Sequence, residues 1–218
     1  MHSNPLTDTL AFLVGNTGDY NALGPAKYLS VAFFLLLIAG SIAIAYINWR
    51  RDPEQRTARH VAIWLMRSVT AGMWFQGTIW KLPLPVSNGF TYWTGALAKY
   101  TALPYHAALV NHVLLPGIGV LQPLVYLFEV FLTVSLLLGV GVRLAGVLAV
   151  LFTAHLWLGL YNDPTEWAWT YAAIMAAHGM FAVTEAGRSL GLDNLLRGEW
   201  SAMFARRPVL QRAYMLAS

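Results

Sequence analysis

The longest apolar run of the chain, from Tyr28 to Trp49, contains no charged side chain. A helix that crosses the hydrocarbon core of a bilayer needs about 20 mainly apolar residues, so this run is long enough to span a membrane. Four more apolar segments follow, at residues 60–81, 123–140, 143–161 and 167–185. Only 11% of the residues are charged, whereas a soluble domain usually has about 25%. The sequence therefore predicts an all-α polytopic membrane protein with five transmembrane helices.

The basic residues indicate how these helices are oriented. Ten of them follow the first, third or fifth segment, namely Arg50, Arg51, Arg56, Arg59, Arg143, Arg188, Arg197, Arg206, Arg207 and Arg212. Only Lys27, Lys81 and Lys99 lie on the other side. Because Lys and Arg are enriched in cytoplasmic loops, we predict an N-terminus outside and a C-terminus in the cytoplasm, in the cytoplasmic membrane of a bacterium or archaeon. Contacts with anionic lipids then explain the net charge of +4, and no nucleic-acid partner is predicted.

The segment between the second and third helices is too long and too aromatic for a plain loop. Large side chains recur there at helical spacing, at Phe90, Trp93, Leu97 and Tyr100. This pattern predicts an amphipathic helix that lies flat in the outer interface. The next piece, Tyr105 to Leu115, either re-enters the membrane or extends the third helix. After Gly187, Leu, Trp and Phe alternate with Arg, which predicts an interfacial cytoplasmic helix.

Charged residues inside a membrane are costly, so each needs a partner or a function. At a rise of about 1.5 Å per residue, Glu129 and His155 each lie about 9 Å below the outer ends of their helices. Lys81 lies at the outer end of the second helix and is long enough to reach down to Glu129. These three candidate catalytic residues are therefore expected at one level, where they would bind a quinone headgroup and relay protons. Alternatively, Lys81 and Glu129 form a structural ion pair and His155 is a packing residue.

The other candidates are cofactor-binding side chains, namely Arg67, Trp74, Tyr126, Arg143 and His178. A structural pair between Arg67 and Glu185 is the favoured interpretation of those two. Ligation of haem, chlorophyll or bacteriochlorophyll by His178 is less favoured because the chain offers no second well-placed histidine. His106 and His112 are six residues apart and would lie on different helical faces, so no metal site is predicted. With no cysteine, disulfides, thiolate metal sites and iron–sulfur clusters are excluded.

Three short motifs occur in order along the second to fifth helices. The first joins Arg67 to Gly77-Thr-Ile-Trp-Lys81, the second joins Glu129 to Leu136-Leu-Leu-Gly139 and Arg143, and the third is Gly187-Arg188-Ser-Leu-Gly-Leu-Asp193-Asn-Leu-Leu196. In these motifs the chain resembles the DoxX/DoxD-like membrane protein family, over about 130 of its 218 residues. The resemblance implies a four-helix bundle at 60–187. An extracytoplasmic segment (1–27) and an added helix with its basic loop (28–59) precede it, and a basic amphipathic tail (188–218) follows.

The family includes the DoxD subunit of thiosulfate:quinone oxidoreductase, which passes electrons from thiosulfate to membrane quinone. Carried over to this chain, the implied site residues are Lys81, Glu129 and Arg143, with Arg67 as a further candidate. This sequence has no soluble portion like that of DoxA, so the resemblance implies a partner chain.

These observations lead us to expect a membrane subunit that binds a quinone or a lipid-like ligand within a larger redox complex. The main alternative is a non-catalytic accessory subunit of a respiratory or photosynthetic complex that binds lipid or pigment. A small transporter is less favoured because the predicted helices have no central breaks and the chain has no internal repeat.

Overall fold

The computed structural model describes residues 4–197 and 208–218, and within these ranges the chain is helical and has no strand. Its helices run in the order α1 (Pro5–Leu13), η1 (Gly18–Ala26), α2 (Lys27–Arg51), η2 (Pro53–Gln55), α3 (Ala58–Ile79), α4 (Asn88–Lys99), α5 (Pro104–Leu109), η3 (Val110–Leu114), α6 (Ile118–Leu138), α7 (Val142–Gly159), α8 (Ala168–Val183), η4 (Ala186–Arg188) and α10 (Pro208–Ala217). The prediction of an all-α chain is confirmed. The predicted tail falls partly outside the described residues, as do Arg206 and Arg207.

Three stretches within the described residues are long and apolar enough to cross a membrane. They are Pro5–Arg51, which ends with α2, and the helices α6 and α7. Helix α8 is apolar but has only 16 residues, and α3 has 22 residues but contains Arg59, Arg67 and Gln76. The chain is therefore a membrane protein, and the count of five transmembrane helices stays a prediction.

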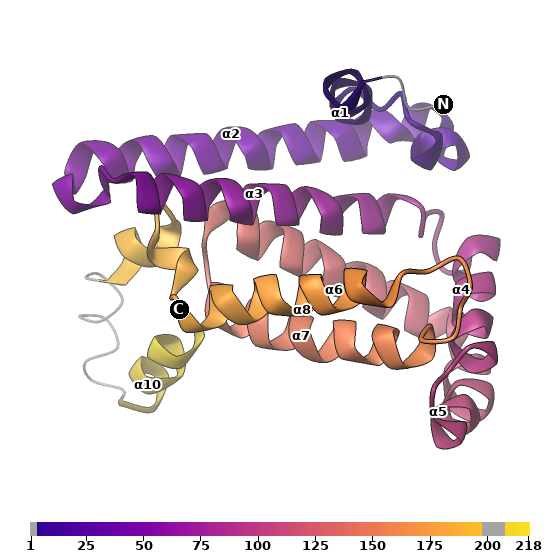
Figure 1. The fold of residues 1–218 in the computed structure, drawn as a ribbon. Coiled ribbons are helices and arrows are strands. Elements are labelled where there is room, and N and C mark those ends of the chain that lie inside the picture. Colours follow the sequence, from indigo (N-terminus) through magenta and orange to yellow (C-terminus); the bar gives the residue numbers. More distant parts are fainter. Residues whose placement is uncertain (1–3, 198–207) are drawn as a thin grey trace.

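The long helices run side by side as a bundle, with α4 and α5 across one end (Figure 1). Within the bundle α3 packs most extensively on α6, and α7 on α8, so the four helices form two pairs. Helix α2 lies against α3 and α6 on the outside of the first pair. The cavity described below lies between these two pairs.

The segment between α3 and α6 caps one end of the bundle, which we call the aromatic end. Helix α4 is amphipathic as predicted, since Phe90 and Leu97 are buried whereas Tyr92 is 67% exposed. For residues 105–115, the prediction of an extension of the third helix was wrong, whereas re-entry into the membrane stays a prediction. α5 and η3 form a separate helical piece beside α4, and a turn at residues 115–117 separates them from α6.

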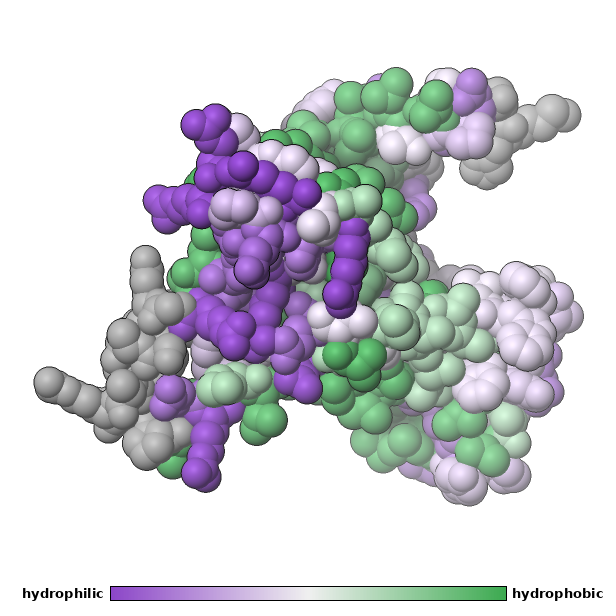
Figure 2. Space-filling view, turned by 60° about the vertical axis from the view of Figure 1, so that its left-hand side comes forward, coloured by the Kyte–Doolittle hydropathy of each residue, from purple (hydrophilic) through white to green (hydrophobic). Residues whose placement is uncertain are grey.

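The opposite end, which we call the basic end, contains the α2–α3 connection, the α6–α7 turn and α10 (Figure 1). Figure 2 turns this end toward the viewer and shows hydrophilic residues gathered on it. The exposed arginines there include Arg50, Arg51, Arg56 and Arg59. One end of the molecule is thus strongly cationic, whereas the helix flanks are apolar.

Arg67 is fully buried near the basic end. Its guanidinium donates to the carbonyl of Leu136 at 2.7 Å and to that of Ser189 at 2.8 Å. The predicted pair with Glu185 was wrong, because Glu185 instead pairs with Arg143, at 3.5 Å, and with Arg188. The Glu185 carboxylate is 35% exposed and pairs near the surface, where desolvation costs less, whereas Arg67 points inward to main-chain carbonyls.

The α6–α7 turn makes this tight packing feasible. Gly139 has a φ of 71°, a left-handed conformation that is easy only for glycine. A Cβ atom there would lie 2.5 Å from Nη1 of Arg67 and 2.6 Å from the Cα of Gly191. Asp193 is also fully buried and accepts a hydrogen bond from the backbone N–H of Gly141 at 3.0 Å. Arg67 and Asp193 are therefore both bonded to main chain at the basic end.

Candidate functional site: a cavity at the aromatic end

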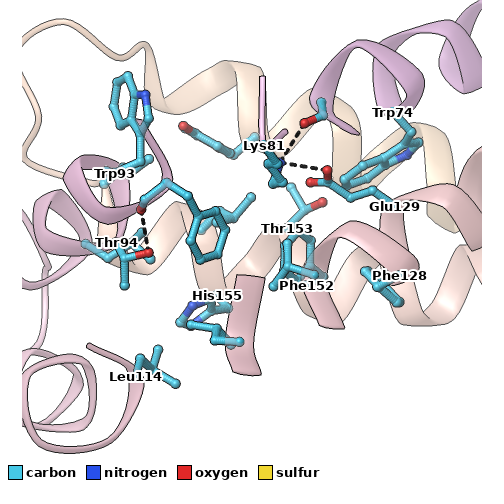
Figure 3. A pocket seen from close by; sticks show the side chains of 18 of the residues that line it. Trp74, Lys81, Trp93, Thr94, Leu114, Phe128, Glu129, Phe152, Thr153 and His155 are labelled. Carbon is cyan, nitrogen blue, oxygen red and sulfur yellow. Dashed lines mark hydrogen bonds and ion pairs between the residues drawn. The ribbon is translucent and has the colours of Figure 1, made fainter. Parts of the chain in front are cut away.

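A cavity of about 820 Å³ lies between the two helix pairs, next to α4. This volume is within the range of about 300–1,000 Å³ that small-molecule sites usually have. Its walls are mostly apolar and aromatic, and its polar side chains are Lys81, Thr94, Glu129, Thr153, His155, Glu166 and Tyr171. Figure 3 shows Lys81, Glu129 and Thr153 close together on one part of the wall, with His155 on another. The three predicted catalytic residues thus line one cavity.

Lys81 and Glu129 form an ion pair on the cavity wall. The Nζ atom of Lys81 lies 2.7 Å from Oε2 of Glu129, and each side chain is only 5% exposed. Nζ also donates to the Gly77 carbonyl at 2.8 Å and lies 4.0 Å from the centre of a Trp80 ring. Gly77 has no side chain, and a Cβ there would lie 3.1 Å from the same carboxylate oxygen. The Gly77-Thr-Ile-Trp-Lys81 motif therefore both supplies the ammonium group and leaves room for its partner.

The main chain next to Lys81 is held by Gln122, a fully buried residue of α6. Its side-chain amide donates to the Lys81 carbonyl, and its oxygen accepts a hydrogen bond from the Ser87 N–H at 2.8 Å. The chain entering α4 is thereby fixed over the cavity. No role was predicted for Gln122 from the sequence.

His155 contacts a histidine that sequence reasoning had not paired with it. Its Nδ1 lies 3.0 Å from Nε2 of His106, which comes from α5. The connection between α4 and α5 is attached to the end of α7, because the N–H of Ala102 donates to the Leu158 carbonyl at 2.9 Å. No helical periodicity relates two residues 49 positions apart, so the sequence carried no signal for this contact.

Trp74 lines the cavity, and His178 lies behind it. The indole N–H of Trp74 donates to Nε2 of His178 at 2.8 Å, and Nδ1 of His178 lies 2.8 Å from the Ile174 carbonyl. An indole can only donate, so the proton of a neutral His178 is on Nδ1. Both ring nitrogens are therefore engaged, and neither is free to bond a haem or chlorophyll metal.

The remaining predicted site residues lie elsewhere. Arg67 and Arg143 are at the basic end, and half-buried Tyr126 of α6 is not part of the cavity wall. Sequence reasoning also missed the pair at the cavity edge between Glu166 and Tyr171, whose hydroxyl donates to the carboxylate at 2.9 Å. Among the described residues, no group of three or more histidine, aspartate or glutamate side chains could hold a metal ion.

Comparison with known proteins gives no relative from which a function could be transferred. No family model, no curated protein and no solved structure matches the chain. The function is therefore argued from the cavity and its chemistry.

Proposed function

We propose that this chain is a DoxX/DoxD-like membrane subunit that binds a quinone in the outer half of its helix bundle. It would transfer electrons as part of a larger complex, because the resemblance implies a partner chain. In this proposal α3 and α8 also cross the bilayer, giving five spans in a bacterial or archaeal cytoplasmic membrane. The basic end then faces the cytoplasm, in line with the enrichment of Lys and Arg there.

The observation that carries the proposal is the buried pair of Lys81 and Glu129 on the cavity wall. A buried ion pair is a poor source of stability, because desolvation costs as much as or more than the attraction returns. Ionisable residues inside a membrane also mark ligand and proton pathways more often than they serve packing alone. A pair that borders an 820 Å³ cavity is therefore better explained by a ligand than by stability.

The walls suit a quinone in particular. A quinone ring is flat and apolar and carries carbonyl oxygens that accept hydrogen bonds, and the cavity offers the donor Lys81 together with the aromatic rings of Trp93 and Phe128. Leu109 and Leu124 line the cavity and are 45% and 57% exposed. The cavity therefore extends to the lipid-facing flank, where an isoprenoid tail would leave it.

Quinone titration in lipid nanodiscs tests the proposal. Trp74, Trp80 and Trp93 line the cavity, so quenching of tryptophan fluorescence by decylubiquinone would report binding. Glu129→Gln removes the carboxylate and leaves a buried ammonium group unpaired, and we expect it to weaken binding about tenfold or more. The matched control is Glu185→Gln at the basic end, which should bind like the wild type. Equal affinity of Glu129→Gln and wild type would overturn the proposal.

An accessory role is the second candidate, and the surface of α2 favours it. Helix α2 exposes Leu29, Leu36 and Tyr46 by 76%, 72% and 62%, as expected for a face that meets lipid or another membrane chain. Purification in mild detergent, followed by mass spectrometry of co-purifying chains and extracted cofactors, separates the two. Recovery with partner chains but without quinone would favour the accessory role.

A further inference from the structure

The pair of His106 and His155 lies where α5 meets α7, at one wall of the cavity. His155 is half-buried and lines the cavity, whereas His106 is only 6% exposed and does not. The His106 ring packs directly on α7, since a Cβ atom on Gly159 would lie 3.0 Å from its Cε1. The two rings therefore have different surroundings, one facing the cavity and the other enclosed by protein.

One hydrogen must lie between the two nitrogens that are 3.0 Å apart. In the first arrangement Nε2–H of His106 donates to Nδ1 of His155, so the proton of a neutral His155 is on Nε2. In the second, Nδ1–H of His155 donates to His106, so the proton of His106 is on its own Nδ1. The two arrangements present opposite groups to the cavity, an N–H donor in the first and a lone pair in the second.

The surroundings of His106 favour the first arrangement. Nδ1 of His106 is buried and has no hydrogen-bond partner among the described residues. The second arrangement would place an N–H there, and buried N–H groups without partners are rarer in proteins than under-satisfied acceptors. The first arrangement also gives both rings the Nε2–H tautomer, which a neutral histidine side chain favours intrinsically. Both considerations assign the proton of His155 to Nε2.

We infer that His106 is a positioning residue that holds His155 as an N–H donor toward the cavity, and that the cavity therefore selects a headgroup with an acceptor oxygen. Nε2 of His155 makes no hydrogen bond to a described residue, so it is available to a ligand. With the Lys81 ammonium group, the cavity then offers two donors. They suit the carbonyl oxygens of an oxidised quinone, whereas the other tautomer of His155 would suit a quinol hydroxyl. The ligand part of this inference rests on the proposed function, and the tautomer part does not.

Nitrogen-15 NMR of the histidine-labelled chain in nanodiscs tests the tautomer without any ligand. The resonances of His155 are identified by their loss in His155→Gln. We expect wild-type His155 to carry its proton on Nε2 and to show a hydrogen-bonded lone pair on Nδ1. In His106→Phe the Nδ1 resonance should move to the position of a free lone pair. In His106→Gln it should stay near the wild-type position, because the amide N–H replaces the imidazole donor.

The control is His112→Phe, since His112 is exposed on the neighbouring η3 turn and its loss should leave His155 unchanged. A proton on Nδ1 of wild-type His155 would overturn the inference, as would a Nδ1 resonance that His106→Phe does not move. Neither result would bear on whether the cavity binds quinone.

Binding of two matched ligands tests the selection of an acceptor oxygen. The probes are 2-methyl-1,4-naphthoquinone and 2-methylnaphthalene, which differ in the two carbonyl groups. We expect the preference of the wild type for the quinone to fall about threefold to tenfold in His106→Phe, as for the loss of one hydrogen bond. His106→Gln should restore it. An unchanged preference would refute the selection, whereas failure of both probes to bind the wild type would refute the proposed function instead.

Discussion

The buried charges at the two ends of the bundle have different surroundings. At the basic end the Arg67 guanidinium and Asp193 are bonded to main chain, and glycines let the segments approach closely, although the buried Nε of Arg67 has no hydrogen-bond partner among the described residues. At the aromatic end Lys81, Glu129 and His155 border a cavity, and the buried hydroxyl of Thr153 has no hydrogen-bond partner among the described residues. The charges at the basic end are thus bonded mainly to main chain, whereas those at the aromatic end border a cavity. Four tests, each with one or two substitutions, can break or sharpen this contrast.

Arg67→Leu should have the largest effect on stability. It removes two buried hydrogen bonds and leaves two carbonyls and Asp193 without this cation, so we expect a loss of about 3–5 kcal/mol. Thermal unfolding in detergent, followed by size-exclusion chromatography, measures it. The exposed Arg59→Leu is the control and should be close to the wild type. A stable Arg67→Leu protein would contradict a stabilising role of these main-chain hydrogen bonds.

Gly139→Ala and Gly95→Ala should change stability in opposite directions. At Gly139 a Cβ meets Arg67 and the backbone at a positive φ, and we expect a loss of about 1–3 kcal/mol. At Gly95, within α4, a Cβ meets nothing within 4 Å, so the better helix propensity of alanine should add up to about 1 kcal/mol. The same unfolding assay checks both, and destabilisation of equal size at the two positions would remove the contrast.

Lys81→Met combined with Glu129→Leu should separate stability from binding. Replacing both members of a buried pair by apolar residues is often neutral or stabilising, so we expect the thermal midpoint to hold or rise. Quinone affinity should nevertheless fall about tenfold or more, because both charged groups on the cavity wall are lost. A large fall in the thermal midpoint would instead mean that the pair serves the fold.

Thr153→Val should give the smallest change, and in the stabilising direction. The valine has a similar shape and removes a buried hydroxyl that has no partner, so we expect a gain of about 1 kcal/mol. Thr133→Val is the matched control, because the Thr133 hydroxyl donates to the Glu129 carbonyl at 2.9 Å and its loss should cost stability. A destabilised Thr153→Val protein would show that the hydroxyl has a partner after all.

The sequence predicted the structure well where the structure is local, or where an unpaired charge would cost much free energy in an apolar interior. Helix α2 lies at Lys27–Arg51, where the run from Tyr28 to Trp49 predicted it, because an uncharged apolar run of this length has few other conformations in a bilayer. The contact between Lys81 and Glu129 was expected because each residue is costly alone in an apolar interior. Both predictions depend on free energies of transfer into an apolar medium, which do not depend on how the surrounding helices are arranged.

The sequence predicted contacts poorly where main-chain groups or non-helical segments supply the hydrogen-bond partner. Arg67 bonds to main-chain carbonyls. Main-chain carbonyls carry no sequence signal, so the predicted partner was a carboxylate, Glu185. The contact between His106 and His155 depends on how the piece between α4 and α6 folds over α7. The start of α6 was also misplaced, since Pro123 lies within the helix rather than at its first residue.

The hydrogen-bond partners of Arg67 are synthesised long after Arg67 itself. The residue leaves the ribosome 69 residues before Leu136 and 122 residues before Ser189. In the proposed five-span topology α3 crosses the bilayer, where an arginine near its centre opposes insertion by about 2.5–3.5 kcal/mol. Its second hydrogen-bond partner, Ser189, is synthesised only after α8. We therefore expect α3 to enter the bilayer only after Ser189 has been synthesised, or to remain beside α2 in the insertion machinery until then. Nascent chains halted before residue 189 should accordingly remain sensitive to proteases.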